Sequence, residues 1–260
     1  MKSPPCVLTI AGSDSGAGAG IQADARTIRA LGGHALTAIT AVTAQNTRGI
    51  TAWRAMPAGL VAAQITAVTG DFAVTAIKTG LLPGGAVIRA VAAALPPDIP
   101  LVVDPVIGST SGTPFLTATG VRALRRHLLP RATLVTPNWP EVAALTGRRV
   151  RTFAEAEDAA RALLATGCLA VLVKGGHGPG RICRDCLVTA GGKVHWFEGP
   201  RVITRNLHGT GCVLSAAIAA FLARGQKVEA AVRAARRFLQ QSLERNRRVR
   251  LGGGAGPALP

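Results

Sequence analysis

The sequence predicts an α/β fold with a mostly parallel central sheet, and two observations lead to it. Short apolar runs rich in β-branched residues alternate with longer segments of helical periodicity along nearly the whole chain. Such alternation is typical of parallel strands joined by crossover helices. Two late apolar runs, at 186–190 and 193–199, are split by Gly191 and Gly192 and predict one hairpin. With 260 residues, 48% of them hydrophobic, and no internal repeat or linker, we expect one domain over residues 1–260.

The elements follow in order from the amino terminus. A strand at 6–12 precedes a helix at 20–32, in which apolar residues three or four positions apart share one face. Each further strand is a short apolar run, and each further helix a longer amphipathic or apolar segment. Besides the hairpin, strands are expected at 35–44, 73–80, 99–105, 132–137 and 169–176, and helices at 58–69, 85–95, 120–128, 140–147, 154–167 and 213–223. A last helix is expected in the arginine-rich stretch after Arg233.

The formal net charge of +17 raises the question of nucleic-acid binding, since basic residues neutralise phosphates. The basic residues are mostly Arg and are scattered along the chain, and few aromatic residues could stack on bases. We therefore do not expect a nucleic-acid partner. One cluster stands out on the last helix and its exit, and a solvated helix face is its simplest interpretation. It consists of Arg233, Arg236, Arg237, Arg245, Arg247, Arg248 and Arg250.

The amino-terminal segment and the cysteines predict a cytoplasmic protein. The start, MKSPPC, has a single Lys and no cleavage pattern, and the longest apolar run is shorter than the ~18 residues of a membrane span. Five cysteines, an odd number, do not predict a disulfide framework. Cys183 and Cys186 have CxxC spacing, but no second pair is spaced for zinc, so we expect ordinary thiols. Cys6 and Cys168 open strand-like runs and are expected in the core.

The stretch NLHGTGC, which ends at Cys212, is the strongest candidate for the functional centre. Gly209, Thr210 and Gly211 stand just before the predicted helix at 213–223. A helix amino terminus offers unpaired N–H groups and the positive end of a dipole, and glycines let an oxyanion come close. From these residues alone, a simple turn before a buried helix is the alternative. A thiol in this first turn is expected to have a pKa below about 8.5.

The glycine-rich loop at 11–24 does not match the common nucleotide-binding motifs. Its third glycine is misplaced for GxGxxG, and no acidic residue lies near the required distance of about 20 positions. A P-loop is excluded because the pair Gly192 and Lys193 is followed by Val194 rather than by Ser or Thr. Neither a dinucleotide-binding nor a P-loop function is therefore predicted.

Eight motifs in this order resemble the hydroxymethylpyrimidine and phosphomethylpyrimidine kinases of thiamin biosynthesis, within the ribokinase-like superfamily. They are LTIAGSDSGAGAGIQAD, ITAVTAQNTRGI, IKTGLL, VVDPVIGSTSG, LVTPNWPEVAALTG, VLVKGGH, HGTGCVLSAAIAA and LGGGAGP, and they cover nearly the whole chain. The resemblance implies a three-layer αβα sandwich with a mostly parallel sheet. It also implies phosphorylation of 4-amino-5-hydroxymethyl-2-methylpyrimidine by ATP, followed by phosphorylation of the monophosphate to the pyrophosphate.

The resemblance assigns phosphoryl transfer to residues around the predicted anion hole. The backbone from Gly209 through Thr210 and Gly211 to Cys212 would donate N–H groups to the moving phosphoryl group. Cys212 occupies the position where related sugar kinases carry an aspartate, so it is the candidate base for the hydroxymethyl proton. Lys174, at the end of a predicted strand, would approach the ATP phosphates, and a surface lysine is the alternative.

Asn138 and Glu141, in TPNWPE, match the NxxE pattern by which this superfamily organises magnesium and phosphate. Asn138 and Thr210 are placed with the ATP site, and Glu141 with the metal. Asp104, at the end of a predicted strand, is a second carboxylate for Mg²⁺, which prefers hard oxygen ligands. For Glu141 the alternative is a charge at the start of a helix.

The family's pyrimidine contact maps onto Gln45, whose amide offers an acceptor and two donors in one plane to an aminopyrimidine edge. Asp24 and the backbone at Gly12 match positions near the hydroxymethyl group. Leu81 stands where the family often has Met and would line the ring. Gln22 and His208 are assigned supporting roles.

Three departures from the family pattern leave alternatives open. Ala17 replaces a usual glycine, Ile203 a common aspartate and Leu207 a common threonine. A pyridoxal or pyridoxine kinase of the same superfamily is therefore the alternative enzyme, because its ring also bears a hydroxymethyl acceptor. A basic nucleic-acid-binding protein on a kinase-like fold is the non-enzymatic alternative. We expect a small-molecule substrate and ATP as partners, no membrane, and a homodimer as a possible assembly.

Overall fold

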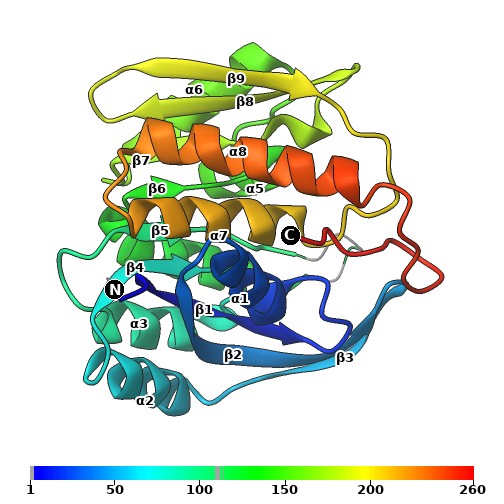
Figure 1. The fold of residues 1–260 in the computed structure, drawn as a ribbon. Coiled ribbons are helices and arrows are strands. Elements are labelled where there is room, and N and C mark those ends of the chain that lie inside the picture. Colours follow the sequence, from blue (N-terminus) through cyan, green and yellow to red (C-terminus); the bar gives the residue numbers. More distant parts are fainter. Residues whose placement is uncertain (1–2, 109–111, 113) are drawn as a thin grey trace.

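A computed structural model describes residues 3–108, 112 and 114–260, so the end of the VVDPVIGSTSG motif, residues 109–111, lies outside the described residues. Within the described chain a nine-stranded sheet has the order β3-β2-β1-β4-β5-β6-β7-β8-β9 (Figure 1). The strands are β1 (Cys6–Asp14), β2 (His34–Asn46), β3 (Gly49–Ala55), β4 (Val74–Thr79), β5 (Leu101–Val103), β6 (Leu134–Val135), β7 (Ala170–Val173), β8 (Ile182–Thr189) and β9 (Val194–Pro200).

The six central strands, β2 to β7 in sheet order, are parallel, and antiparallel strands close both edges. At one edge β8 and β9 form the predicted hairpin. At the other edge β3 pairs with β2, and this strand was not predicted. Most of its side chains are exposed or half-buried, so residues 49–55 lack the apolar run that marks the other strands.

Helices cover both faces of the sheet, which confirms the three-layer αβα sandwich (Figure 1). The helices are α1 (Gly20–Ala30), α2 (Ala58–Thr69), α3 (Gly84–Ala94), α4 (Ala118–Ala123), α5 (Trp139–Thr146), α6 (Phe153–Leu164), α7 (Thr210–Leu222) and α8 (Val228–Arg245). One core joins the sheet to α2, α3, α5 and α6, and a second joins it to α1, α7 and α8. The predicted helix at 120–128 is α-helical only to Ala123, where a π-helical turn, Leu124–Leu128, takes over.

The cysteines are free thiols in the part of the chain that the structure describes, and their places differ in part from expectation. Cys168 is buried as predicted, whereas Cys6 is only half-buried because it opens β1 at the end of the sheet. Cys183 and Cys186 lie three positions apart on β8, so their side chains point to opposite faces and cannot bind one metal ion together. No described helix is both long and apolar enough to cross a membrane.

Candidate active site

The carboxyl ends of three neighbouring strands bring the predicted ATP and metal residues together. Asp104 follows β5, Asn138 follows β6 and Lys174 follows β7, and loops at this edge of a parallel sheet commonly form the site. The Lys174 Nζ lies 2.7 Å from Asp104 Oδ1 and 3.7 Å from Glu141 Oε2. Burial opposes the charge on Lys174, but the two carboxylates outweigh burial and raise its pKa. Lys174 is therefore a half-buried cation paired with two carboxylates rather than a free surface lysine.

The amino end of α7 is open to an anion beside this cluster. Gly209 is its N-cap with φ +81°, and a Cβ there would lie 2.0 Å from the backbone oxygen of Gly18, so only glycine fits. Thr210 begins the helix. The next residue, Gly211, lies close to Lys174, since a Cβ on Gly211 would be 3.3 Å from Lys174 Nζ. The Thr210 N–H donates to the Leu207 carbonyl at 3.3 Å, whereas the N–H groups of Gly211 and Cys212 belong to the first turn beside the cation. A helix amino terminus next to a cation is an arrangement that stabilises phosphate charge.

Cys212 lies in the first turn of α7 as predicted, but the expected lowering of its pKa is wrong for this structure. Burial raises the pKa of the thiol to about 11, and the carboxylates of Asp24 and Asp104 add to the rise. Lys78 lowers the pKa, without outweighing burial. Cys212 is half-buried, and the cost of desolvating its thiolate exceeds the stabilisation that Lys78 and the helix dipole supply.

Beneath the thiol, Lys78 and Asp24 form a fully buried ion pair, with 2.8 Å between Nζ and Oδ2. Asp24 also accepts a hydrogen bond from Thr9. Asp24, which was expected near the hydroxymethyl group, is thus fully buried with its carboxylate paired to Lys78. Burial opposes the charge on Lys78, but Asp24, Cys212 and Asp104 outweigh burial and raise its pKa.

Glu141 is a charge at the start of a helix, as the alternative interpretation predicted, and it also lies beside Lys174. It closes a capping box with Asn138 at the start of α5: Asn138 N–H donates to Glu141 Oε2 at 2.7 Å, and Glu141 N–H donates to Asn138 Oδ1 at 2.9 Å. Burial raises the pKa of Glu141 to about 7, against the lowering effect of Lys174. Such a carboxyl changes charge near neutrality, which is typical of functional sites.

Two carboxylates near Lys174 are a suitable donor set for Mg²⁺. Within residues 3–108, 112 and 114–260 no cluster of three His, Cys, Asp or Glu side chains forms a cage for a metal. Mg²⁺ commonly binds one or two carboxylates together with substrate phosphates and water, so Asp104 and Glu141 fit that chemistry. Asp104 is further fixed by Ser215 and Thr136, whose hydroxyls donate to it at 3.2 Å each.

Three of the predicted pyrimidine residues lie at the carboxyl ends of neighbouring strands: Gln45 on β2, Gly12 on β1 and Leu81 just after β4. Gln45 stands near the end of β2, with its Nε2 3.0 Å from His208 Nε2 and its Oε1 3.2 Å from Thr43 Oγ1. Gly12 and Leu81 are adjacent, since a Cβ on Gly12 would lie 2.9 Å from the Leu81 side chain. A polar amide and an apolar side chain are thus available for a small heterocycle.

Sequence reasoning missed Lys78, Ser215 and Asp14 as site residues. Lys78 interrupts an apolar strand, and a charge within such a run signals a paired buried group. Asp14 accepts hydrogen bonds from the N–H groups of Gly16, Gly18 and Ala19, and so shapes the glycine-rich loop. Ser215 gave no signal, because a small polar residue in an apolar helix is common.

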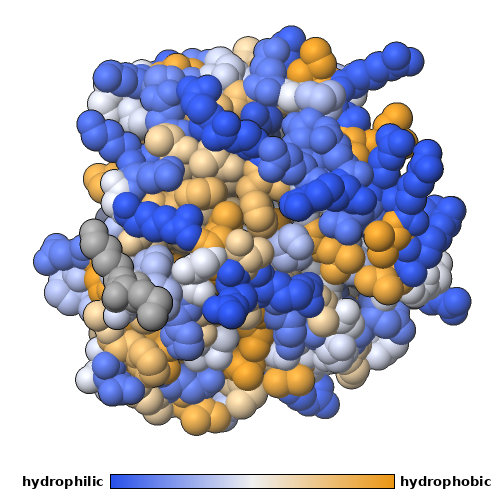
Figure 2. Space-filling model, in the orientation of Figure 1, coloured by the Kyte–Doolittle hydropathy of each residue, from blue (hydrophilic) through white to orange (hydrophobic). Residues whose placement is uncertain are grey.

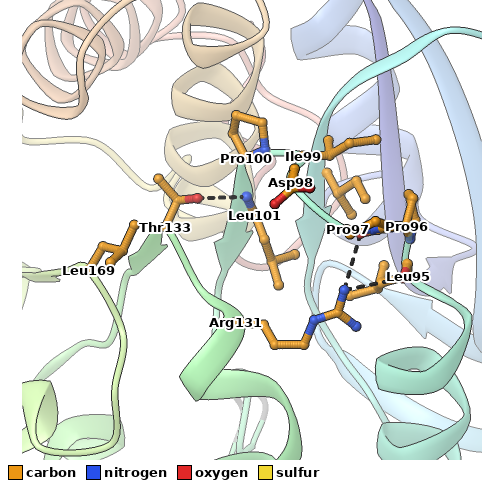
Figure 3. Close-up of a pocket in the computed structure, with 11 residues that line it drawn as sticks. Leu95, Pro96, Pro97, Asp98, Ile99, Pro100, Leu101, Arg131, Thr133 and Leu169 are labelled. Atoms are coloured by element: carbon orange, nitrogen blue, oxygen red, sulfur yellow. Dashed lines mark hydrogen bonds between the residues drawn. The ribbon is translucent and has the colours of Figure 1, made fainter.

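A cavity of about 430 Å³ lies at the opposite, amino-terminal ends of the strands (Figure 3). Leu101 and Thr133 line it just where β5 and β6 begin, and Arg131 donates to the backbone oxygens of Leu95 and Pro96 across it. Its cation is already engaged with backbone carbonyls. The candidate active site therefore lies at the other, carboxyl-terminal ends of the strands.

The arginines of the last helix are partly engaged in structure. Arg236 donates to Asp185 at 2.6 Å, and Arg233 donates to Glu229 at 2.9 Å. Hydrophilic side chains are interspersed with apolar ones over the face formed by α8, α7 and α1 (Figure 2). This arrangement is consistent with a solvated helix face.

The chain matches the model of one protein family, described as phosphomethylpyrimidine kinase, over residues 14–259. It is 46% identical over 256 residues to the hydroxymethylpyrimidine/phosphomethylpyrimidine kinase of Streptomyces coelicolor. This alignment covers 98% of this chain and 94% of that protein. The crystal structure of phosphomethylpyrimidine kinase from Clostridium difficile matches with a TM-score of 0.80 and 34% identity, over 92% of this chain and 99% of that one. The pyridoxal kinase from Staphylococcus aureus in complex with AMP-PCP and pyridoxal matches with a TM-score of 0.88 and 28% identity, over 98% and 93% of the two chains. The chain therefore belongs to the phosphomethylpyrimidine kinase family.

Proposed function

We propose that the chain transfers the γ-phosphoryl group of ATP to 4-amino-5-hydroxymethyl-2-methylpyrimidine and then to the monophosphate, as one catalytic domain of thiamin biosynthesis. The convergence of Lys174, Asp104 and the amino end of α7 carries the proposal. Membership of the family supports the pyrimidine as acceptor. The complex of the Staphylococcus aureus enzyme with AMP-PCP and pyridoxal supports the binding of a nucleotide and a small ring by this fold.

The chain's own residues would act mainly by position and charge. Lys174 and the N–H groups of Gly209, Gly211 and Cys212 would hold the phosphoryl oxygens, and Asn138 would orient the nucleotide's phosphates. The Thr210 N–H would join them only by leaving the Leu207 carbonyl. Mg²⁺ bound by Asp104 and Glu141 would neutralise phosphate charge. Since phosphoryl transfer requires little covalent chemistry from the protein, this positioning accounts for most of the expected catalysis.

Gln45 would hold the aminopyrimidine edge while Leu81 and the backbone at Gly12 contact the ring and its hydroxymethyl group. Cys212 would accept the hydroxymethyl proton. Because burial raises the pKa of the thiol to about 11, this role requires bound substrate and metal to favour the thiolate. A mostly protonated thiol would otherwise only line the site.

The test is an ATP-dependent assay with the hydroxymethylpyrimidine and with its monophosphate, in which mono- and pyrophosphate products are measured separately. Both products should form, and Gln45→Ala should weaken pyrimidine binding by about 1–3 kcal/mol with little change in ATP binding. An unchanged KM for the pyrimidine in Gln45→Ala would show that the acceptor site has been misplaced.

Pyridoxal is the second candidate acceptor, because the likeness to the Staphylococcus aureus pyridoxal kinase extends over 98% of this chain. The same assay with pyridoxal compares the two values of kcat/KM directly, and a higher value for pyridoxal would reverse the assignment. A homodimer remains a prediction that sedimentation would test. Binding of DNA or RNA without ATP turnover would instead support the non-enzymatic alternative.

A further inference from the structure

The side chain of His208 links the predicted pyrimidine residue to the glycine-rich loop. Its Nε2 lies 2.9 Å from Asp14 Oδ2 and 3.0 Å from Gln45 Nε2. A single ring nitrogen thus faces a carboxylate oxygen and an amide terminus at once. Only one pattern of protons satisfies both contacts, and that pattern determines how the Gln45 amide meets a substrate.

Asp14 requires a proton on the shared nitrogen. Burial opposes ionisation of Asp14, but its oxygens accept hydrogen bonds from the backbone N–H groups of Gly16, Gly18 and Ala19, and its pKa is lowered. These three donors favour the ionised form whatever the state of His208, so Asp14 is a carboxylate. A carboxylate oxygen only accepts hydrogen bonds. His208 Nε2 must therefore carry a hydrogen and donate it to Asp14 Oδ2.

A donating Nε2 cannot also accept a hydrogen from the Gln45 amide nitrogen. The amide oxygen and nitrogen have nearly the same shape, so the hydrogen-bond network decides which of them faces which partner. Turning the amide by 180° places its oxygen against His208 and its nitrogen against Thr43. The ring Nε2–H of His208 is then shared by Asp14 Oδ2 and the Gln45 amide oxygen. The Gln45 amide N–H donates to the Thr43 hydroxyl, which itself donates to the Ser13 carbonyl at 3.0 Å.

The backbone holds His208 in place for this role. The backbone N–H of His208 donates to the Gly256 carbonyl at 3.1 Å, and the backbone carbonyl of His208 accepts from the Ala258 N–H at 2.8 Å. A Cβ on Gly18 would lie 2.2 Å from the ring, so the glycine-rich loop closes over the other side. Gly209, the next residue, packs against the same Gly18, since a Cβ on it would lie 2.0 Å from the Gly18 oxygen. We therefore take the His208 side of the Gln45 amide as its anion-hole side.

We propose that His208 is a positioning residue that fixes the oxygen of the Gln45 amide toward the anion hole and thereby selects the substrate edge. This inference rests on the proposed function. The amide then offers its oxygen to a donor on the anion-hole side and its N–H to an acceptor on the Thr43 side. In the aminopyrimidine, the ring nitrogen, the 4-amino group and the 5-hydroxymethyl group follow one another around the ring. Pairing the amino group with the amide oxygen therefore directs the hydroxymethyl group toward Gly209.

The 4-oxo analogue of the pyrimidine separates this role from a general structural one, because its ring N–H and carbonyl present the reverse edge. The ratio of kcat/KM for the amino substrate to that for the 4-oxo analogue should fall about ten- to a hundredfold in His208→Ala, since the freed amide can turn. His208→Gln, which keeps an N–H donor at the ε position, should retain most of the ratio. His195→Ala, at a half-buried histidine on β9, serves as the matched control.

An equal loss for both substrates in His208→Ala would overturn the proposal, because a structural role lowers both alike. Nitrogen-15 spectra of the wild-type histidines test it without turnover. A hydrogen on Nε2 of His208 is expected, and a bare Nε2 would refute the assignment whatever the variants do. If the wild-type protein phosphorylates neither pyrimidine, the proposed function fails, and the Nε2 protonation alone decides this inference.

Discussion

The thiol of Cys212 should react with an uncharged alkylating agent more slowly than a free cysteine at neutral pH. Because its pKa is raised to about 11, only about one thiol in three thousand is ionised at pH 7.5, against about one in eleven for a free thiol of pKa 8.5. A more basic thiolate is the stronger nucleophile, with a Brønsted slope of about 0.4–0.5, and this recovers roughly tenfold or slightly more. The net expectation is reaction roughly twentyfold slower than that of a free thiol, before any loss of access.

The assay is iodoacetamide labelling of the substrate-free protein at several pH values, with the Cys212 peptide quantified by mass spectrometry and Cys212→Ser confirming its assignment. The rate should rise about tenfold per pH unit up to at least pH 10. A plateau at or below pH 8.5 would refute the reasoning, because it would mean that the helix dipole and Lys78 outweigh burial.

Turnover then tests the base role itself. If Cys212 accepts the proton in the complete complex, Cys212→Ala should lower kcat by about 10²–10⁴-fold while ATP binding stays near wild type. Near wild-type turnover would leave the anion hole, Lys174 and the metal to carry the reaction. Labelling and turnover are independent, so a protonated thiol in the free enzyme and a base in the complex can both be true.

Three further predictions follow from the buried charges and from one backbone angle. Lys78→Met should destabilise the fold by about 3–5 kcal/mol in urea unfolding, because Asp24 loses its buried partner, and adding Asp24→Leu should recover most of the loss; an effect below about 1 kcal/mol would contradict the ion pair's role. Ala17→Gly should stabilise the fold by about 0.5–1 kcal/mol, since Ala17 has φ +56°, and a lower urea midpoint would contradict the strain. The pKa of Glu141, about 7, predicts ADP affinity without Mg²⁺ that falls on the order of fivefold as pH rises from 6 to 8.5, and Glu141→Gln should abolish the change measured by calorimetry.

Periodicity predicted the parallel strands and most of the helices, because buried parallel strands are continuous apolar runs. It missed β3 because an edge strand with exposed side chains has no such run. It also extended the helix at 120–128 through a π-helical turn, since apolar spacing does not distinguish the two helix types. The local sequence pattern therefore predicts which segments are buried. It does not predict an exposed strand that forms by pairing with a neighbour, or the type of a helical turn.

For the site, resemblance located the loops, and the structure supplied their mutual geometry. Asp104 and Lys174 are 70 positions apart and meet only because β5 and β7 end at the same edge. The error on Cys212 has the same origin. Helix position can be read from sequence, whereas desolvation depends on which distant residues surround the sulfur. The full burial of Asp24 against Lys78 was likewise not predictable from sequence, and its place near the hydroxymethyl group stays a prediction.

The charge balance of the cluster determines how it would respond to a proton or to Mg²⁺. Lys78 and Lys174 neutralise Asp24 and Asp104, so the ionisation of Glu141 decides whether the cluster is neutral or carries one negative charge. A polyphosphate approaching Gly209 and Gly211 is repelled by that last charge. Protonation of Glu141 would remove this repulsion. Mg²⁺ held by Asp104 and Glu141 would remove it too, and would add positive charge that attracts the nucleotide. A pKa of Glu141 raised to about 7 thus keeps the cluster close to neutral, while the ionised form would remain available to hold Mg²⁺ at physiological pH.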